Sequence, residues 1–349
     1  MDQSMLKKGV FLLGWVLLVS CHRSPSDPPA GPAFYHWTTH LSVDSLEQHF
    51  LDALNTRQLY VRYFDLDWDS DRGEAIPLAT VQFGHLPTGE GLTIVPTVFI
   101  TNRCMQALSE ADIHPLAQRV AHRLLDLHPT TLQRFGEVQF DCDWTGGTQE
   151  TYFAFLRAIR SYLPARVRLS ATIRLHQIAG FRQTGVPPVG EGVLMFYNMG
   201  QVADWASDHS ILHLPAAEPY LTDAIKRYPL SLRLALPLFS WGAVFRGSEL
   251  LYLINNLRDS DLQDTLHFRP LGRQRYAVQK STYLKSHFVY RGDHIRVEQV
   301  DPDLLRATAR RLKEWLPPTQ QSVVWYHLDS RLLKHWTHEE LTEVMDLMD

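Results

Sequence analysis

The chain has 349 residues, of which 45% are hydrophobic and 21% charged, a composition typical of globular proteins and unlike that of disordered chains. Its 34 Lys and Arg residues nearly balance its 38 Asp and Glu residues. The resulting net charge of −4 gives no electrostatic reason to expect a nucleic acid partner, because phosphate binding requires a clustered basic surface. The 9 Trp, 13 Tyr and 16 Phe residues suit a site that stacks against a ligand, although such side chains also fill cores.

The first segment of the chain has the pattern of an export signal. Lys7 and Lys8 precede an apolar run over residues 9–19, which is shorter than the roughly 20 residues of a membrane-spanning helix. Cys21 follows in a sequence similar to the bacterial lipobox, whose cysteine becomes lipidated and N-terminal after cleavage. We therefore predict a signal peptide over residues 1–20. The alternative is a plain signal peptide followed by a chance cysteine.

Residues 21–32 are predicted to be a tether between the lipidated Cys21 and the folded part of the chain. Four prolines in this stretch prevent a helix. His22 follows Cys21, so the aspartate that retains lipoproteins in the inner membrane of enteric bacteria is absent. These features predict a protein of the bacterial cell envelope, held on a membrane by its lipid, with the outer membrane preferred.

Eight short apolar or alternating runs recur after residue 32, and helical patterns separate most of them. The predicted strands span residues 33–38, 58–67, 94–101, 137–144, 167–175, 192–198, 231–239 and 322–328. Asp44 and Glu47 have the spacing of a capping box at the start of the first helix, and Asp301 with Pro302 begins a later one. Alternating strands and helices favour an α/β fold, a (β/α)8 TIM barrel over residues 33–349. A doubly wound sheet is the alternative, but no glycine-rich turn follows the first strand.

Two of the predicted strands carry polar side chains on one face. Asp141 and Asp143 alternate with apolar residues in the fourth strand, and Arg174 and His176 end the polar face of the fifth. Because barrel sites lie at the carboxyl ends of the strands, we expect these four side chains to converge there. Two neighbouring carboxylates favour a raised pKa for one of them, and a buried Arg174 should pair with one of the two. A solvated loop is the alternative for the fourth strand.

The sequence indicates no metal or cofactor. The aspartates from Asp67 to Asp71 have the alternating spacing of a calcium loop, but Arg72 stands where the sharp turn requires glycine. No Cys and His spacing typical of zinc is present. Cys104 and Cys142 could form one disulfide in an exported protein or remain free thiols.

Two short patterns connect the predicted strands to a known family. Residues 138–145 read VQFDCDWT and residues 195–198 read MFYN. They resemble the Asp-Gly-x-Asp-x-Asp-x-Glu and Met-x-Tyr-Asp motifs of glycoside hydrolase family 18, the chitinase-like barrels. The resemblance extends from about residue 33 to 330 and implies a barrel with a glycan site at its carboxyl end. It also implies that Trp325, in the eighth strand, lies at the floor of the sugar site.

The departures from that family concern its chemistry. Thr145 stands at the position of the family's proton-donating Glu, and Val138 at that of its leading Asp. A threonine hydroxyl is far too weak an acid to donate a proton near neutral pH. The resemblance implies that Tyr197 and Asp143 polarise the N-acetyl group of the substrate, in a mechanism that here lacks its acid. Residues 139–143 are also similar to the Gln-x-Asp-x-Asp strand of a family of exported bacterial barrel lipoproteins without an assigned activity.

About ninety residues separate the starts of the seventh and eighth predicted strands. Some members of the chitinase-like family carry an α+β insertion at this place, so we predict an inserted subdomain over residues 245–300. Its basic residues either form a solvated hairpin, which we favour, or contact an acidic glycan. They are Arg269, Arg273, Arg275, Lys280, Lys285 and Arg291.

Three functions remain open on the sequence, and whether the chain is an enzyme stays undecided. The first is a hydrolase with a relocated acid. Such an enzyme needs two carboxyl groups, about 5–5.5 Å apart for retention or 6.5–9.5 Å apart for inversion of the sugar's configuration. Here Asp65 or Asp67 could stand opposite Asp141 or Asp143. The second is a glycan-binding lipoprotein without catalysis, and the third is an envelope scaffold. The catalytic candidates are Asp141, Asp143, Tyr197 and Asp67. The candidates for substrate binding are Trp37, Arg174, His176, Asn198, Trp241 and Trp325.

Overall fold

The computed structural model describes residues 31–89, 91–132, 134–316 and 322–348. The predicted signal peptide, Cys21 and most of the predicted tether lie outside these residues. Within the described part of the chain, no helix is both long enough and apolar enough to cross a membrane.

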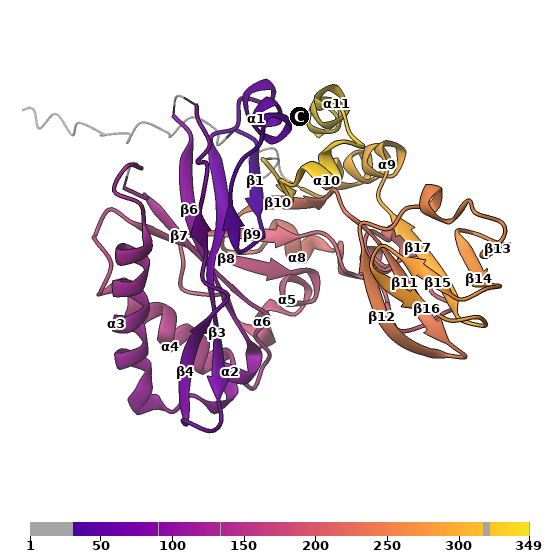
Figure 1. The fold of residues 1–349 in the computed structure, drawn as a ribbon. Helices are drawn as coiled ribbons and strands as arrows, with labels where there is room; N and C mark the ends of the chain where they lie inside the picture. The colour runs from indigo at the N-terminus through magenta and orange to yellow at the C-terminus, as the bar shows by residue number, and fades with distance from the viewer. Residues whose placement is uncertain (1–30, 90, 133, 317–321, 349) are drawn as a thin grey trace, which may run out of the picture. The chain divides into compact units, whose positions relative to one another are not determined.

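Eight parallel strands close into a barrel in which the order of the strands follows the chain (Figure 1). The strands are β1 (Ala33–His36), β3 (Gln58–Asp69), β6 (Thr93–Ile100), β7 (Glu137–Cys142), β8 (Arg168–Arg174), β9 (Glu191–Met195), β10 (Ser231–Pro237) and β18 (Val323–Tyr326). Strand β1 pairs with both β3 and β18, which closes the ring. The predicted TIM barrel is confirmed, and the open sheet of the doubly wound alternative is wrong.

Helices follow most of the strands of the barrel. They are α1 (Ser45–Ala53), α2 (Asn102–Ala107), α3 (Glu110–Leu127), α4 (Gln149–Arg160), α5 (Leu175–Ala179), α6 (Phe181–Thr184), α7 (Leu214–Ala217), α8 (Asp223–Lys226), α9 (Pro302–Lys313), α10 (Ser330–Leu333) and α11 (His338–Asp346). The predicted capping box is present, because Asp44 accepts from the Glu47 backbone N–H and Glu47 accepts from that of Asp44. Asp301 caps α9 by accepting from the Leu304 backbone N–H at 2.8 Å.

The interior of the barrel is polar and aromatic, because alternate residues of each strand point inward. The Tyr35 hydroxyl on β1 donates to Gln139 Oε1 on β7 at 2.8 Å, across the barrel. Near the amino-terminal ends of the strands, the buried Glu137 accepts from the Ser170 hydroxyl at 2.6 Å and from the Tyr60 hydroxyl at 3.2 Å. A buried carboxylate is tolerated only with such partners, so these bonds stabilise the lower part of the barrel.

Strand β3 continues past the barrel as a hairpin with β4 (Glu74–Leu78), and β2 (His40–Leu41) pairs with β5 (Gln82–Phe83) beside it. The segment with calcium-loop spacing lies at the turn of the β3–β4 hairpin, where Asp69 Oδ1 accepts from the Asp71 backbone N–H. The two thiols that the sequence left undecided, Cys104 and Cys142, are both buried and free.

Between β10 and β18 the chain forms a separate antiparallel sheet with the order β12-β11-β17-β14-β13. Its strands are β11 (Ser240–Arg246), β12 (Glu249–Asn255), β13 (Phe268–Gly272), β14 (Arg275–Val278) and β17 (His294–Gln299), and a short helix, η2 (Asp259–Leu262), follows β12. A two-stranded hairpin of β15 (Thr282–Leu284) and β16 (His287–Val289) interrupts it. We call all seven strands the inserted sheet. They have a hydrophobic core of their own, which includes Val244, Ile254 and Ile295.

Candidate functional site

Two adjoining depressions lie at the carboxyl ends of the barrel strands. The first has a volume of about 480 Å³ and is lined by Asp143, Trp144, Thr145, Arg174, Leu175, His176, Met195, Tyr197, Asn198, Met199 and Tyr220. The second has a volume of about 330 Å³ and is lined by Trp37, Thr38, Asn198, Phe239, Ser240, Trp241, Asn255, Asn256, Tyr326, His327, Asp329 and Arg331. Asn198 borders both, so we treat them as one site with two parts.

An ion pair between neighbouring strand ends forms the wall of the first depression. Arg174 Nε, at the end of β8, donates to Asp143 Oδ1 at 2.6 Å, and Arg174 Nη2 donates to Oδ2 at 3.2 Å. The Gln177 side chain joins the same two strand ends, because it accepts from the Arg174 backbone N–H and donates to the Trp144 carbonyl. The ion pair predicted for Arg174 is therefore present, and its partner is the outer of the two aspartates on the fourth strand.

The inner aspartate, Asp141, has a different environment. Its side chain is buried, with 5% of the residue exposed, and it accepts from the Thr172 hydroxyl at 2.6 Å. Burial raises the pKa of Asp141 to about 6, although the nearby Arg174 and the Thr172 hydrogen bond lower it. The raised pKa predicted for one of the two carboxylates thus falls on Asp141. This carboxyl group lies deeper in the barrel and does not line either depression.

Aromatic rings connect the two depressions. The ring of Tyr197 lies 4.9 Å from that of Tyr326, centroid to centroid, and Tyr326 lies 5.9 Å from both Trp37 and Phe239. Phe239 in turn lies 5.3 Å from Trp241. We call these five residues the aromatic wall. It brings together three of the predicted site residues: Trp37 just after β1, Tyr197 just after β9, and Trp241 in β11, the first strand of the inserted sheet.

The prediction for Trp325 is wrong. Its side chain is fully buried, and it pairs in register with Phe34 of β1. Residues opposite one another on parallel strands share a face, and the next residue, Tyr326, is the one that meets the aromatic wall. Trp325 therefore packs outside the barrel, under the helices. Tyr326 occupies the place in the site that was predicted for Trp325.

Asp67 also lies apart from the two depressions, so the expectation that it stands in the site opposite Asp141 or Asp143 is wrong. It accepts from the Arg103 guanidinium, with a 3.1 Å bond from Nε, and from the Thr101 hydroxyl at 2.6 Å. The Arg103 hydrogen bonds lower the pKa of Asp67 to about 2. The other acid proposed on this strand, Asp65, accepts from Arg62 Nε at 2.7 Å. Neither aspartate is placed as a proton donor.

Among the described residues, two acidic side chains line the depressions, and each is paired with an arginine. Asp143 is held by Arg174, and Asp329 accepts from Arg331 Nε at 2.9 Å. Burial raises the pKa of Asp329, but the hydrogen bonds from Arg331 leave it below its usual range. Thr145, at the position of the family's Glu, lines the first depression, and its backbone N–H donates to Thr148 Oγ1 at 2.9 Å.

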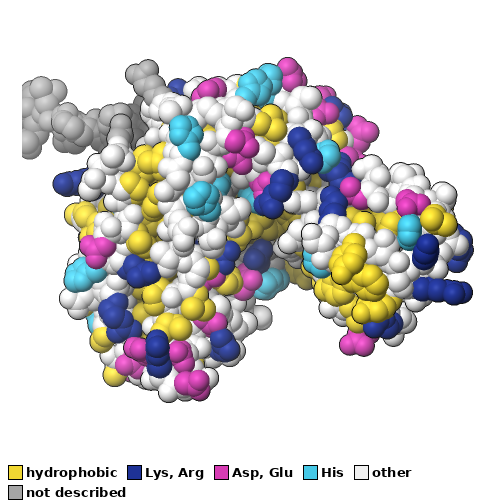
Figure 2. All heavy atoms as spheres, in the orientation of Figure 1, with side chains coloured by type: hydrophobic (Ala, Val, Ile, Leu, Met, Phe, Trp, Pro, Cys, Tyr) yellow, Lys and Arg dark blue, Asp and Glu magenta, His cyan; other side chains and the backbone are white. Residues whose placement is uncertain are grey.

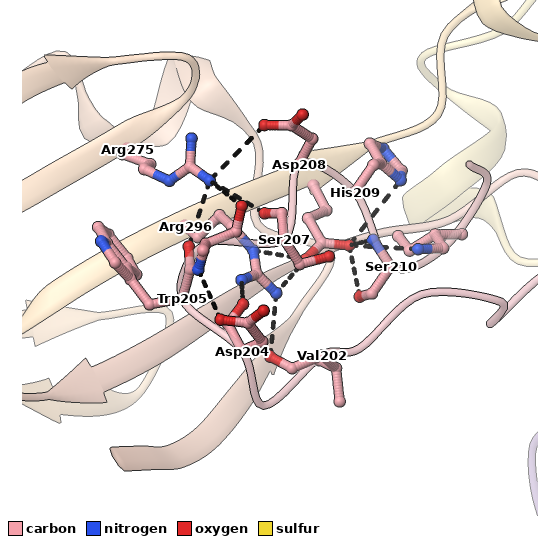
Figure 3. A network of polar contacts seen from close by, with 12 residues as sticks. Val202, Asp204, Trp205, Ser207, Asp208, His209, Ser210, Arg275 and Arg296 are labelled. Atoms are coloured by element: carbon pink, nitrogen blue, oxygen red, sulfur yellow. Dashed lines mark hydrogen bonds and ion pairs between the residues drawn. The ribbon is translucent and has the colours of Figure 1, made fainter. Parts of the chain in front are cut away.

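The loop after β9 carries Asn198 and is fastened to the inserted sheet. Asn198 has a left-handed backbone (φ 54°), and its N–H donates to the Ile211 carbonyl at 2.7 Å. Figure 3 shows how β17 holds the returning part of this loop. Arg296 donates to Glu298 Oε1 at 2.8 Å, and Glu298 Oε2 accepts from the Ser210 hydroxyl at 2.6 Å. Since Arg296 and Glu298 are fully buried, this paired network sets the position of the loop.

The remaining predicted residue, His176, lines the first depression at the start of α5, and partial burial lowers its pKa. Three lining residues were not predicted from the sequence: Tyr326, Asn255 and Asn256. Tyr326 had a usable signal, because it follows Trp325 by one residue and so points to the opposite face. The two asparagines had none, because only the folding of the inserted sheet places them beside the barrel. Among the described residues, no group of three or more His, Cys, Asp or Glu side chains is placed to hold a metal ion.

Comparison with solved structures places this barrel among chitinase-like folds. The spore cortex-lytic enzyme SleL of Bacillus cereus shares 13% identity over 90% of this chain and 75% of its own, with a TM-score of 0.55. The GH18 chitinase ChiB of Flavobacterium johnsoniae shares 11% identity over 91% of this chain and 94% of its own, with a TM-score of 0.51. A chitinase of Bacteroides thetaiotaomicron shares 10% identity over 90% of this chain and 96% of its own, with a TM-score of 0.50.

Searches with protein-family models and against curated protein sequences find no match for this chain. At identities of 13% or less, the similarity to solved structures is one of fold. The resemblance to glycoside hydrolase family 18 that the sequence predicted is confirmed at that level: the chain has the barrel fold of the chitinase-like proteins.

Proposed function

We propose that this chain binds a glycan in the two depressions and does not cleave it by the acid catalysis of glycoside hydrolase family 18. The proposal depends on two features of the site taken together. The aromatic wall lines it, and its two acidic side chains, Asp143 and Asp329, are both bound to arginines. Thr145 supplies no acid in place of the family's Glu.

The geometry suits sugar rings. Aromatic side chains offer apolar faces to the C–H groups of a sugar, as Trp37 and Trp241 can in the second depression. Polar side chains in fixed positions then orient the hydroxyl groups. Asn198 and Asn256 line the second depression, and Arg174 lines the first, where its ion pair with Asp143 fixes the guanidinium.

The test is a titration of the full chain with β-1,4-linked N-acetylglucosamine oligosaccharides, followed by mass spectrometry of the sugars after prolonged incubation. We expect binding without release of shorter products. The variant Trp37→Ala should bind at least about tenfold more weakly, because it removes a central ring of the site. Release of products by the wild type would contradict the proposal, and so would the absence of any glycan binding.

A hydrolase with a relocated acid is the second candidate, which the pKa of Asp141 favours although this carboxyl group lies below the first depression and does not line it. A carboxyl group with a pKa of about 6 is suited to proton donation near neutral pH. If Asp141 is that acid, any release of products by the wild type should disappear in Asp141→Asn, whereas binding of the oligosaccharide should persist.

We also propose that the exported chain is anchored by lipid at Cys21 to a membrane of the bacterial envelope, with the outer membrane preferred. The short apolar run, the lipobox-like sequence and the proline-rich residues 21–32 support this proposal. A glycan-binding barrel on such a tether would meet polysaccharides of the envelope.

A further inference from the structure

Three aromatic side chains form an exposed patch on the β15–β16 hairpin of the inserted sheet. Tyr283, Phe288 and Tyr290 are 74%, 39% and 52% exposed. Tyr283 and Phe288 are opposite one another in the hairpin register, with ring centroids 5.0 Å apart, and Tyr290 lies 4.9 Å from Phe288. Leu284 and Val289 point to the other side of the hairpin and are buried. We call Tyr283, Phe288 and Tyr290 the aromatic patch.

The inserted sheet has enough apolar side chains for its core without these rings. Its core is closed by buried residues, and the hairpin contributes Leu284 and Val289 to it. Contiguous exposed apolar surface of this kind is typical of binding sites. Figure 2 shows hydrophobic side chains gathered on the inserted sheet, with Lys and Arg side chains beside them.

The charges around the aromatic patch favour an anionic partner. Residues 240–300 hold nine Lys and Arg against six Asp and Glu, whereas the whole chain has a net charge of −4. Lys280 and Arg291 flank the open end of the hairpin, where the Arg291 backbone N–H donates to the Ser281 hydroxyl at 2.9 Å. Both side chains are exposed, and neither has an acidic partner among the described residues. The Arg246 guanidinium lies over the Tyr290 ring at 5.0 Å.

The tip of the hairpin contacts a residue that lines the second depression. The Lys285 ammonium group, at the tip of the hairpin, donates to the carbonyl of Asn256, which lines that depression. The Tyr252 hydroxyl on β12 donates to the Phe288 carbonyl at 2.9 Å. Three residues after Tyr252 on the same strand, Asn255 also lines the depression. At about 3.3 Å per residue, the step from Tyr252 to Asn255 is about 10 Å.

We propose that the aromatic patch, together with Lys280 and Arg291, binds the continuation of an anionic polysaccharide whose neighbouring sugars occupy the second depression. This inference rests on the proposed glycan binding and specifies its ligand as an extended, negatively charged chain. The rings pack against sugar faces, the exposed tyrosine hydroxyls bond to sugar hydroxyls, and the two free cations pair with acidic groups. An anionic membrane surface would also attract these positive charges, but it would not require the hairpin to lie beside the second depression.

The experiment compares two soluble chitin derivatives with one backbone, anionic carboxymethyl chitin and neutral glycol chitin, and a short neutral N-acetylglucosamine oligosaccharide. All proteins are full chains carrying Cys21→Ser, so that no lipid is attached. Tyr283→Ala/Tyr290→Ala should bind carboxymethyl chitin at least about tenfold more weakly and the short oligosaccharide as the wild type does. Lys280→Gln/Arg291→Gln should weaken binding of carboxymethyl chitin, with a smaller salt dependence, and leave that of glycol chitin unchanged.

The control variant, Arg269→Gln/Arg310→Gln, removes the same charge from exposed positions outside the hairpin and should bind like the wild type. Because all substituted side chains are exposed, melting temperatures should change little. Wild-type affinity of both hairpin variants for carboxymethyl chitin would overturn the inference. The inference would also be overturned if the hairpin variants lost binding to phosphatidylglycerol vesicles but kept their binding to carboxymethyl chitin. If the wild type binds the polymer through the hairpin but no short oligosaccharide, the proposed function of the depressions fails while the anionic-glycan surface stands.

Discussion

Arg174 at the end of β8 and Asp143 just after β7 form a two-bond ion pair at the mouth of the barrel, with Nε–Oδ1 and Nη2–Oδ2 distances of 2.6 and 3.2 Å. The Asp143 side chain is half exposed, so this pair is not buried in the way that Arg296 and Glu298 are. Exposed pairs contribute little to folding, roughly 0–1 kcal/mol. The pair is therefore better explained by its place on the wall of the first depression than by stability.

The variant Asp143→Asn tests this explanation. We expect the free energy of unfolding to fall by no more than about 1 kcal/mol, because water already reaches the carboxylate. Oligosaccharide affinity should fall by about tenfold, because the guanidinium loses the partner that orients it. Thermal melting and calorimetric titration measure the two effects. Glu343→Gln, which removes the exposed 2.8 Å pair with Arg306 on α9, is the control and should leave affinity intact. A large loss of stability in Asp143→Asn with unchanged binding would show a structural pair.

Two tryptophans that the sequence assigned to one site should behave differently. Trp325→Ala should lower the free energy of unfolding by about 3–5 kcal/mol, since the ring is fully buried outside the barrel. Trp37→Ala should cost less stability, because this ring is partly exposed, but it should weaken glycan binding at least about tenfold. Chemical denaturation and titration separate the two effects. If a folded Trp325→Phe protein lost as much glycan affinity as Trp37→Ala, Trp325 would have to be part of the site.

The pKa of Asp141 predicts how stability depends on pH. Because the folded protein raises this pKa from 3.8 to about 6, the folded state binds the proton more tightly than the unfolded state does. The wild type should therefore gain stability relative to Asp141→Asn as the pH falls through 6 toward 4. We expect the difference in unfolding free energy to change by about 2 kcal/mol between pH 7.5 and 4.5.

Urea denaturation of the two proteins across this range measures that difference. Burial lowers the pKa values of His36 and His327 to about 4, so both proteins should lose stability as these side chains become protonated. That loss is common to both and cancels in the comparison. A difference that does not change with pH would show that Asp141 titrates normally.

Lipid anchoring is tested in a bacterial host. Radiolabelled palmitate should be incorporated into the wild type and not into Cys21→Ser, because the lipid is attached through that sulfur. Cys104→Ser is the control for labelling of another cysteine and should label like the wild type. Equal labelling of the wild type and Cys21→Ser would contradict the lipoprotein proposal.

The sequence was sufficient for the barrel because its evidence is local. A strand is recognised by alternation over a few residues, and a helix start by a cap such as Asp44 or Asp301. Each barrel strand begins within one residue of its predicted start. The alternation on β7 and β8 also determined that Asp141, Asp143 and Arg174 would point into the barrel, since period two depends only on the extended backbone.

Tertiary structure alone decided which residues complete the site. The pairing of Trp325 with Phe34 assigns Trp325 to the outer face, and this register joins strands from opposite ends of the chain. Arg103 neutralises Asp67 from 36 positions away, and Lys285 brings the hairpin to Asn256 from 29 away. Such contacts depend on how the barrel closes and how the inserted sheet folds, and neither leaves a periodic signal in the local sequence. The sequence therefore determined the strands and the faces of β7 and β8, whereas long-range packing determined the outer face of Trp325 and the neighbours of each polar group.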